Sequence, residues 1–439
     1  MIKRLLDALW LGLLAALVFA IPPTFHGDEA MYLSMSRDYA TAFLDGDLAA
    51  LRVEPPYYVD SDEQLRLLNG SVQRYAAGFF WQLAGATVDD LPTRPGWDWG
   101  ADYDTNVAEG HVPNSTVLAA GRLASSIFLA LSIVAIFALA WQFDGRLPAY
   151  VVSALYAVNP IILLNGRRSM QEGAMLLFGI LVILVAVHIS KRRFERQPIP
   201  IFLWGALVVT SALALVSKHS AVVFVGGAFG WIFITEVLRR PSQPLLTMIK
   251  LGGAGLLVVA LVIALSPALW SDPRARFADI LQNRAFMLDL QVTADPFAPT
   301  PMAYRLQQIV TEPFMTPLQH FEVAGWATYQ PIMDDVARYM ASPFSGVQFG
   351  AVLGGAVMLL VLIGVIFSLR RSWRAGVLIW LGITVASLLV NPLPWQRYFL
   401  PLIPVYALLA GIGVDGLLRR FVLTSVPDNT PISPADQAG

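Results

Sequence analysis

The chain has 439 residues, of which 56% are hydrophobic and only 14% are charged. Soluble domains carry about a quarter charged residues, so this composition excludes an ordinary soluble enzyme and indicates an integral membrane protein. The formal net charge of −1 leaves no basic footprint for nucleic acid, and the absence of cysteine excludes disulfides, thiol catalysis and cysteine–zinc sites.

Repeated apolar runs predict an all-α polytopic protein with about ten transmembrane helices rather than a barrel, whose strands would alternate. The predicted spans are residues 5–22, 117–142, 147–165, 170–190, 199–217, 220–238, 250–269, 347–369, 375–391 and 398–417. A signal peptide cleaved after Ala20 is an alternative for the first run, but Asp7 interrupts the run and Pro22 closely follows the cut.

The basic turns orient these spans. If Lys3 and Arg4 are cytoplasmic, alternation places Arg146, Lys250 and the basic groups at 191–196, 239–240, 370–374 and 419–420 on the same side. We therefore expect both termini in the cytoplasm, in a bacterial inner (plasma) membrane protein.

Two long segments then fall outside, at residues 23–116 and 270–346. The first is polar and aromatic, and the second contains an amphipathic stretch at 274–288, so we expect helices that lie on the outer membrane surface rather than separate domains. The predicted division is an N-terminal membrane region over residues 1–269 that includes the first outer loop, a second outer loop 270–346, C-terminal membrane helices 347–420 and a disordered tail 421–439.

The acidic pair Asp28 and Glu29 directly follows the first span. Charged carboxylates close to a membrane cost free energy, so their presence suggests a functional role. Neighbouring side chains on a helix point about 100° apart, so we expect Asp28 alone to act as general base and Glu29 to orient the site. Two alternatives remain: the pair begins a helix and satisfies its free N–H groups, or His26 and the acids hold a metal. We favour a surface position for His26, because three polar residues in one turn are a weak metal pattern.

A few cations lie at the outer ends of spans, against the positive-inside rule. They are Arg122, Arg167, Arg168, Lys218 with its neighbour His219, and Arg397 with its neighbour Tyr398. Several cations that face one outer cavity would suit a phosphate headgroup.

Each of these cations also has an ordinary explanation. Arg168 and Glu172 are four residues apart and would share a helix face, either as a local ion pair or with Glu172 aiming Arg168 at a phosphate. Lys218 needs an anion or extends to water. Prolines near Arg397 free backbone groups beside it, although Arg397 also suits an interfacial anchor.

In their order, these motifs resemble the dolichyl-phosphate-mannose–protein mannosyltransferase group, which includes the aminoarabinose–lipid A transferases, within the GT-C superfamily. The resemblance rests on Gly-Asp-Glu-Ala-Met-Tyr-Leu at 27–33, Ala-Gly-Arg-Leu-Ala at 120–124, Gly-Arg-Arg-Ser-Met-Gln-Glu at 166–172, Leu-Val-Ser-Lys-His at 215–219 and Arg-Tyr-Phe-Leu-Pro at 397–401. The usual His-Pro-Pro stretch of the first loop is replaced by residues 69–75, and Glu172 stands where relatives often have Asp.

The resemblance implies a GT-C-like bundle and an inverting hexosyl- or pentosyltransferase that uses a polyprenyl-phosphate-linked sugar on the extracytoplasmic face. The acceptor is a lipid, a glycan or a protein. Asp28 would take the acceptor's proton, and no cofactor is required, although a divalent cation is possible. The donor phosphate would be bound by Arg397, Arg168, Lys218 and Arg122, with Glu172, Tyr398 and His219 beside them. The alternatives are a transporter or flippase of a lipid-linked anion and a non-catalytic assembly protein.

Overall fold

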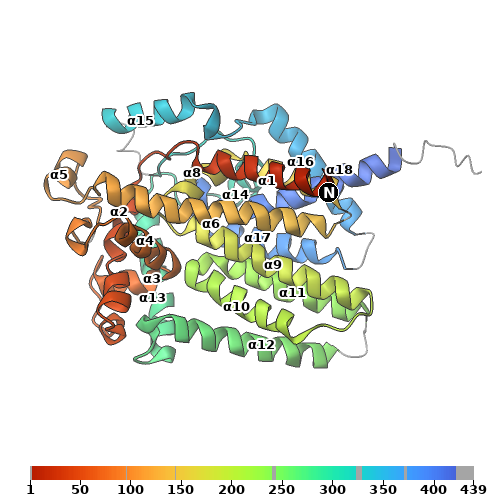
Figure 1. Cartoon of the computed structure of the whole chain (residues 1–439), viewed down its shortest axis with the longest axis horizontal. Helices are drawn as coiled ribbons and strands as arrows, with labels where there is room; N and C mark the ends of the chain where they lie inside the picture. The colour runs from red at the N-terminus through yellow and green to blue at the C-terminus, as the bar shows by residue number, and fades with distance from the viewer. Residues whose placement is uncertain are drawn as a thin grey trace, which may run out of the picture.

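The computed structural model describes residues 2–94, 96–143, 145–239, 244–322, 329–369 and 373–421 (Figure 1). Across these ranges every regular element is a helix, so the predicted all-α class is confirmed. The predicted disordered tail and the basic residues Arg240, Arg370 and Arg371 lie outside the described residues.

Each predicted span coincides with a helix or a helix pair of one bundle. These are α1 (Ile2–Phe19), α6 (Ser115–Trp141), α7 (Arg146–Ala157) with α8 (Pro160–Arg167), α9 (Glu172–Phe194), α10 (Ile201–Ser217), α11 (Val222–Arg239), α12 (Pro244–Leu265), α16 (Gly350–Ser368), α17 (Gly376–Val390) and α18 (Leu402–Phe421).

The number of membrane crossings does not follow directly from the number of apolar segments. By length and composition, six helices of the described ranges could cross a membrane, or up to seven if α7 and α8 form one bent span. Helices α10 and α17 are shorter, and α1 carries Lys3, Arg4 and Asp7 near its start. A count of ten crossings is therefore not confirmed.

The two outer loops are also largely helical. The first holds α2 (Gly27–Met35), α3 (Asp62–Leu68), α4 (Val72–Leu83) and α5 (Tyr103–Ala108), and the second holds α13 (Pro273–Ala294), α14 (Met302–Thr311) and α15 (Gln330–Ala341). Figure 1 shows α2, α3, α4, α5 and α13 gathered at one end of the long helices. The amphipathic stretch predicted at 274–288 lies within α13. Its position on a membrane surface stays a prediction.

A bend between α7 and α8 brings the second outer loop to the bundle. The two helices meet at 63° around Asn159, whose side chain accepts hydrogen bonds from the N–H groups of Ile161 and Ile162 and so begins α8. The same amide donates to the Pro313 carbonyl at 2.8 Å. The Asn-Pro pair is therefore a kink, and it also holds the second outer loop against the bundle.

Candidate active site

His26 begins the helix that carries the acidic pair. Its backbone is extended, its Nδ1 accepts a hydrogen bond from the Asp28 N–H at 3.1 Å, and the Glu29 carboxylate accepts one from the His26 N–H at 3.1 Å. This capping box fixes the first turn of α2. His26 is only 1% exposed, so the expectation of a surface histidine is wrong. The imidazole is buried because it caps α2 through Nδ1 and contacts Glu322 through Nε2.

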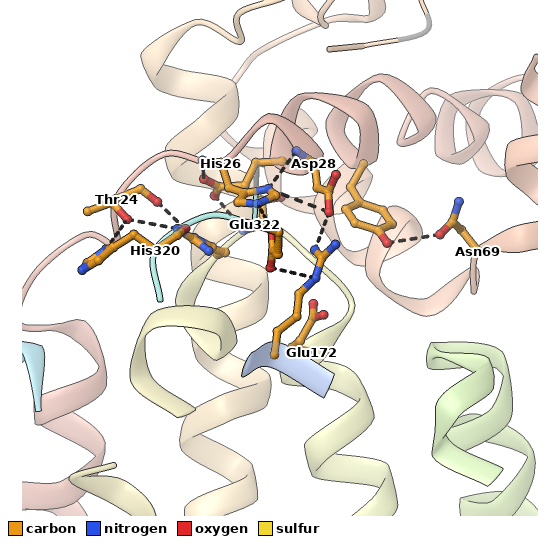
Figure 2. Close-up of polar contacts among 12 residues, drawn as sticks. Thr24, His26, Asp28, Asn69, Glu172, His320 and Glu322 are labelled. Atoms are coloured by element: carbon orange, nitrogen blue, oxygen red, sulfur yellow. Dashed lines mark hydrogen bonds and ion pairs between the residues drawn. The ribbon is translucent and has the colours of Figure 1, made fainter. Parts of the chain in front are cut away.

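Asp28, Glu322 and Arg397 form one ion-paired cluster. The Arg397 Nη1 lies 2.5 Å from Asp28 Oδ2, and its Nε lies 3.1 Å from Glu322 Oε1. Glu322 Oε2 is 2.9 Å from His26 Nε2, which must carry the imidazole proton because Nδ1 already accepts a hydrogen bond. Figure 2 shows Asp28, His26 and Glu322 pointing toward one another. The cluster therefore joins α2, the second outer loop and η8 (Gln396–Phe399).

The charges in this cluster decide the ionisation of both acids. Burial is the largest single effect and raises the pKa of Asp28, but the charge of Arg397, its hydrogen bond and the neighbouring His26 together outweigh burial and hold the pKa below its usual value. Burial and Arg397 oppose each other in the same way at Glu322, whose pKa also falls well below its usual value. Asp28 is therefore a carboxylate at neutral pH, and its side chain keeps 14% of its surface exposed. It can accept a proton.

Glu29 has a different role from its neighbour. Its carboxylate is fully buried and bidentate with Arg122, with both nitrogen–oxygen distances at 2.8 Å. It also accepts from the Ser169 N–H at 2.9 Å. Glu29 thus satisfies the start of α2, as the alternative interpretation of the acidic pair required, and it ties α2 to α6 and to the α8–α9 connection. The Asp28 side chain takes no part in the cap, to which Asp28 contributes only its N–H.

The predicted pairing of Arg168 with Glu172 is wrong. Helix α8 ends at Arg167, Arg168 is extended, and α9 begins only at Glu172, so no continuous helix brings the two side chains together. Glu172 instead binds the Lys218 ammonium at 2.5 Å. Arg168 is 1% exposed and donates to the Thr24 carbonyl and hydroxyl at 3.1 Å each and to the His320 carbonyl at 2.5 Å.

Arg167 points the opposite way and fixes the end of α1. It donates to the carbonyls of Leu17 at 2.6 Å and Val18 at 2.9 Å, which belong to the last turn of α1 and lack partners within that helix. It also donates to the Phe344 carbonyl and the Tyr339 hydroxyl. Together the adjacent arginines hold the chain on both sides of Pro22, immediately before the acidic pair.

A second group of polar side chains lies beside the cluster. The Tyr32 hydroxyl donates to Asn69 at 3.1 Å (Figure 2 labels Asn69 and Glu172). Burial raises the pKa of Tyr32 well above its usual value, and the negative charges of Glu172 and Asp28 raise it further, while Arg397 and Arg284 oppose them. Tyr32 therefore lies within the electrostatic influence of all four charged groups, Glu172, Asp28, Arg397 and Arg284.

Arg284 is the cation that the sequence did not point to. It extends from α13, donates to the Leu68 carbonyl and lies 3.2 Å from His219 Nδ1. In the described ranges of the chain it forms no ion pair with a carboxylate. Tyr398 stands near as well: it stacks on Trp395 with ring centroids 5.5 Å apart. The cations Arg397, Lys218 and Arg284 are thus all brought to the same end of the bundle as Asp28.

Across the residues that the structure describes, no group of three or more His, Asp and Glu side chains is arranged to hold a metal ion. His26, Asp28 and Glu322 are held instead by hydrogen bonds and by Arg397.

The buried acids predict acid sensitivity. The pKa values of Asp28, Glu29 and Glu322 lie below ordinary values of 3.8 for aspartate and 4.5 for glutamate. The unfolded chain therefore binds protons more readily than the folded one, so folding free energy is lost as pH falls. We expect the melting temperature of the purified protein to fall below about pH 4.5, measured by thermal unfolding in detergent. A melting temperature that rises toward acid would contradict these ion pairs.

Comparison with known proteins shows which solved structures share this fold. No family model and no curated protein matches the sequence. The solved structure of ArnT from Cupriavidus metallidurans in the apo state is 12% identical with a TM-score of 0.52, covering 96% of this chain and 61% of that one. Archaeal oligosaccharyltransferase AglB from Archaeoglobus fulgidus, in complex with an inhibitory peptide and a dolichol-phosphate, is 10% identical with a TM-score of 0.52, covering 96% and 51%.

The apo form of the Archaeoglobus fulgidus oligosaccharyltransferase gives 12% identity and a TM-score of 0.52, covering 94% and 51%. The chain thus spans about half to three fifths of the length of these proteins. At such identities the likeness establishes the fold alone, which this chain shares with ArnT and with the oligosaccharyltransferase. With its apolar helices, the chain is an integral membrane protein.

Proposed function

We propose that the chain is an inverting glycosyltransferase that moves a sugar from a polyprenyl-phosphate donor to an acceptor on the extracytoplasmic face. The observation that carries this proposal is the ionised Asp28 carboxylate, partly exposed and held 2.5 Å from Arg397, in a neighbourhood that also contains Arg284. The fold adds support, because it is shared with an oligosaccharyltransferase whose structure contains a dolichol-phosphate.

The chemistry asks for one base and a stabilised leaving group. The acceptor oxygen attacks the anomeric carbon while Asp28 takes its proton, and the bond to the lipid phosphate breaks with its electron pair on the phosphate oxygen. Arginine and lysine donors offset the charge that develops there, in a site shielded from bulk water. No enzyme nucleophile is needed, because a single displacement inverts the anomeric carbon.

The contacts divide the cations into two sets. We assign the donor phosphate to Arg397, Lys218 and Arg284, with Tyr398 and His219 beside them. Among the described residues, Arg397 leaves its Nη2 without a protein partner, Lys218 uses one of its three donors on Glu172, and Arg284 has only a carbonyl and an imidazole. We assign Arg122 and Arg168 to holding α2 and its approach in place, because Glu29, Thr24 and His320 already occupy them.

The direction of the site follows from the distribution of basic turns. We propose that both termini are cytoplasmic, that both outer loops are extracytoplasmic, and that the membrane is a bacterial inner (plasma) membrane. The donor's lipid chain would lie against the apolar helices, so the donor would stay anchored in the bilayer throughout the reaction.

A transfer assay tests the proposal. Purified protein is incubated with radiolabelled polyprenyl-phosphate sugars and membrane extract, with and without a chelator. We expect label to move from the lipid donor to an acceptor fraction, with inversion at the anomeric carbon seen by NMR. Binding or translocation of donor without transfer would favour the transporter instead, and loss of transfer with the chelator would reveal a divalent cation.

A further inference from the structure

The second outer loop completes the proline-broken end of α17. Prolines at 392 and 394 stop the helix and leave carbonyl groups that no helical N–H can reach. Side chains of the second outer loop take their place: Arg305 donates to Leu389 at 2.8 Å, Thr300 to Pro392 at 3.0 Å and Gln308 to Pro394 at 3.3 Å. Residues 300–308 of the second outer loop therefore run beside residues 389–394, which lead to Arg397.

The last contact before the active site is a reciprocal pair of glutamines. The Gln319 N–H donates to Gln396 Oε1 at 2.8 Å, and the Gln396 N–H donates to Gln319 Oε1 at 2.8 Å. Two such bonds close a ring, and a ring cannot slip by one residue without losing both. Gln396 immediately precedes Arg397, and Gln319 lies three residues before Glu322, so this ring sets the register of both charged residues.

The Gln396 side-chain NH2 group also donates two hydrogen bonds. Its Nε2 donates to Glu312 Oε2 at 3.2 Å and to the Pro317 carbonyl at 3.1 Å, and the side chain is 2% exposed. Both amide protons and the oxygen therefore have partners, which leaves one orientation for the side chain. Nothing in this network touches Asp28 itself.

We propose that Gln396 and Gln319 are positioning residues, whose reciprocal pair fixes the distance between the Glu322 carboxylate and the Arg397 guanidinium and so aims Arg397 at Asp28. The kinetic consequence rests on the proposed function, whereas the structural consequence does not. Loss of the pair should let the second outer loop shift, and Arg397 would then face Asp28 less accurately.

Gln396→Leu removes one bond of the pair, the one that Gln396 Oε1 accepts, together with the contacts of Gln396 to Glu312 and Pro317, and changes the side-chain volume little. Thr300→Val is the matched control, because it removes a hydroxyl contact of the same loop to the same broken segment. We expect Gln396→Leu to lower kcat by about 10²-fold, as a small misplacement can, and Thr300→Val to leave kcat near wild type. Gln319→Leu, at a half-buried position, should reproduce the effect and serves if Gln396→Leu does not fold.

The pH profile separates positioning from general loosening. The groups that face Asp28 are His26, Glu322 and Arg397, with Tyr32 nearby. If Arg397 turns away, Asp28 loses its counter-charge, so the acidic limb of the kcat profile should move to higher pH in Gln396→Leu and stay in place in Thr300→Val. An unchanged kcat and acidic limb in Gln396→Leu would overturn the proposal.

Hydrogen exchange followed by mass spectrometry gives a readout that needs no activity. Gln396→Leu should raise exchange in both residues 312–322 and residues 396–399, whereas Thr300→Val should act at residues 391–395. If wild-type protein transfers no sugar, the proposed function fails and this measurement alone decides. Wild-type exchange at 312–322 in Gln396→Leu would then reject the positioning role.

Discussion

Asp28→Asn is expected to lower the transfer rate by about 10²–10⁴-fold, because an amide cannot accept the acceptor's proton. The change preserves the shape of the side chain, and Arg397 keeps Glu322 as a partner at 3.1 Å. Folding and donor binding should therefore survive. Single-turnover transfer measures the rate, and quenching of tryptophan fluorescence by polyprenyl phosphate measures donor binding.

Asp89→Asn is the control for Asp28→Asn, since Asp89 is an exposed carboxylate of the same outer loop. It should behave as wild type in both assays. If Asp28→Asn also retained the wild-type rate, Asp28 would not be the base. Cellular function that survives the Asp28→Asn substitution would then fit an assembly protein better than an enzyme.

Arg397→Met should cost both activity and stability. It removes a charge that opposes the developing phosphate charge, for which losses of about 10²–10³-fold in rate are typical. It also leaves Asp28 and Glu322 largely buried without their shared partner, and breaking such a pair costs about 3–5 kcal/mol. Thermal unfolding in detergent and single-turnover transfer measure the two effects.

The pH dependence distinguishes this effect from a loss of packing. Without Arg397 the pKa values of Asp28 and Glu322 should rise above their unfolded values, so the variant should regain stability as pH falls toward acid, opposite to wild type. Arg338→Met, at an exposed position of α15, should change neither property. Equal loss of stability at all pH values in Arg397→Met would show that the charges are not the cause.

Much of the framework was predictable because it depends on composition alone. Apolar runs become helices wherever the backbone must satisfy its own hydrogen bonds, and the ten predicted runs all coincide with helices. The meeting of Asp28 with Arg397 also followed from one physical rule, since both charges were expected at the same ends of the apolar spans. Neither inference required knowledge of loop structure.

The predictions failed where a side chain's role depends on irregular backbone. The Arg168–Glu172 pair assumed a continuous helix, which the chain interrupts after Arg167. Glu322 lies in a segment without periodicity, and no pattern distinguishes it from the other acids of the outer loops. Arg284 is one of several polar residues of α13, and its proximity to Tyr32 arises from the packing of α13 against α3.

The ion pair between Asp28 and Arg397 spans 369 residues, nearly the whole chain, and this separation bears on biosynthesis. A ribosome makes both carboxylates of the cluster before it makes the guanidinium that neutralises them. Glu29 can pair with Arg122 early and hold α2 to α6, but Asp28 and Glu322 gain their shared counter-charge only when Arg397 has been made. This end of the bundle therefore completes its ion pairs only after translation has passed the proline-broken segment before Arg397, and a chain that stopped earlier would lack the guanidinium that neutralises both acids.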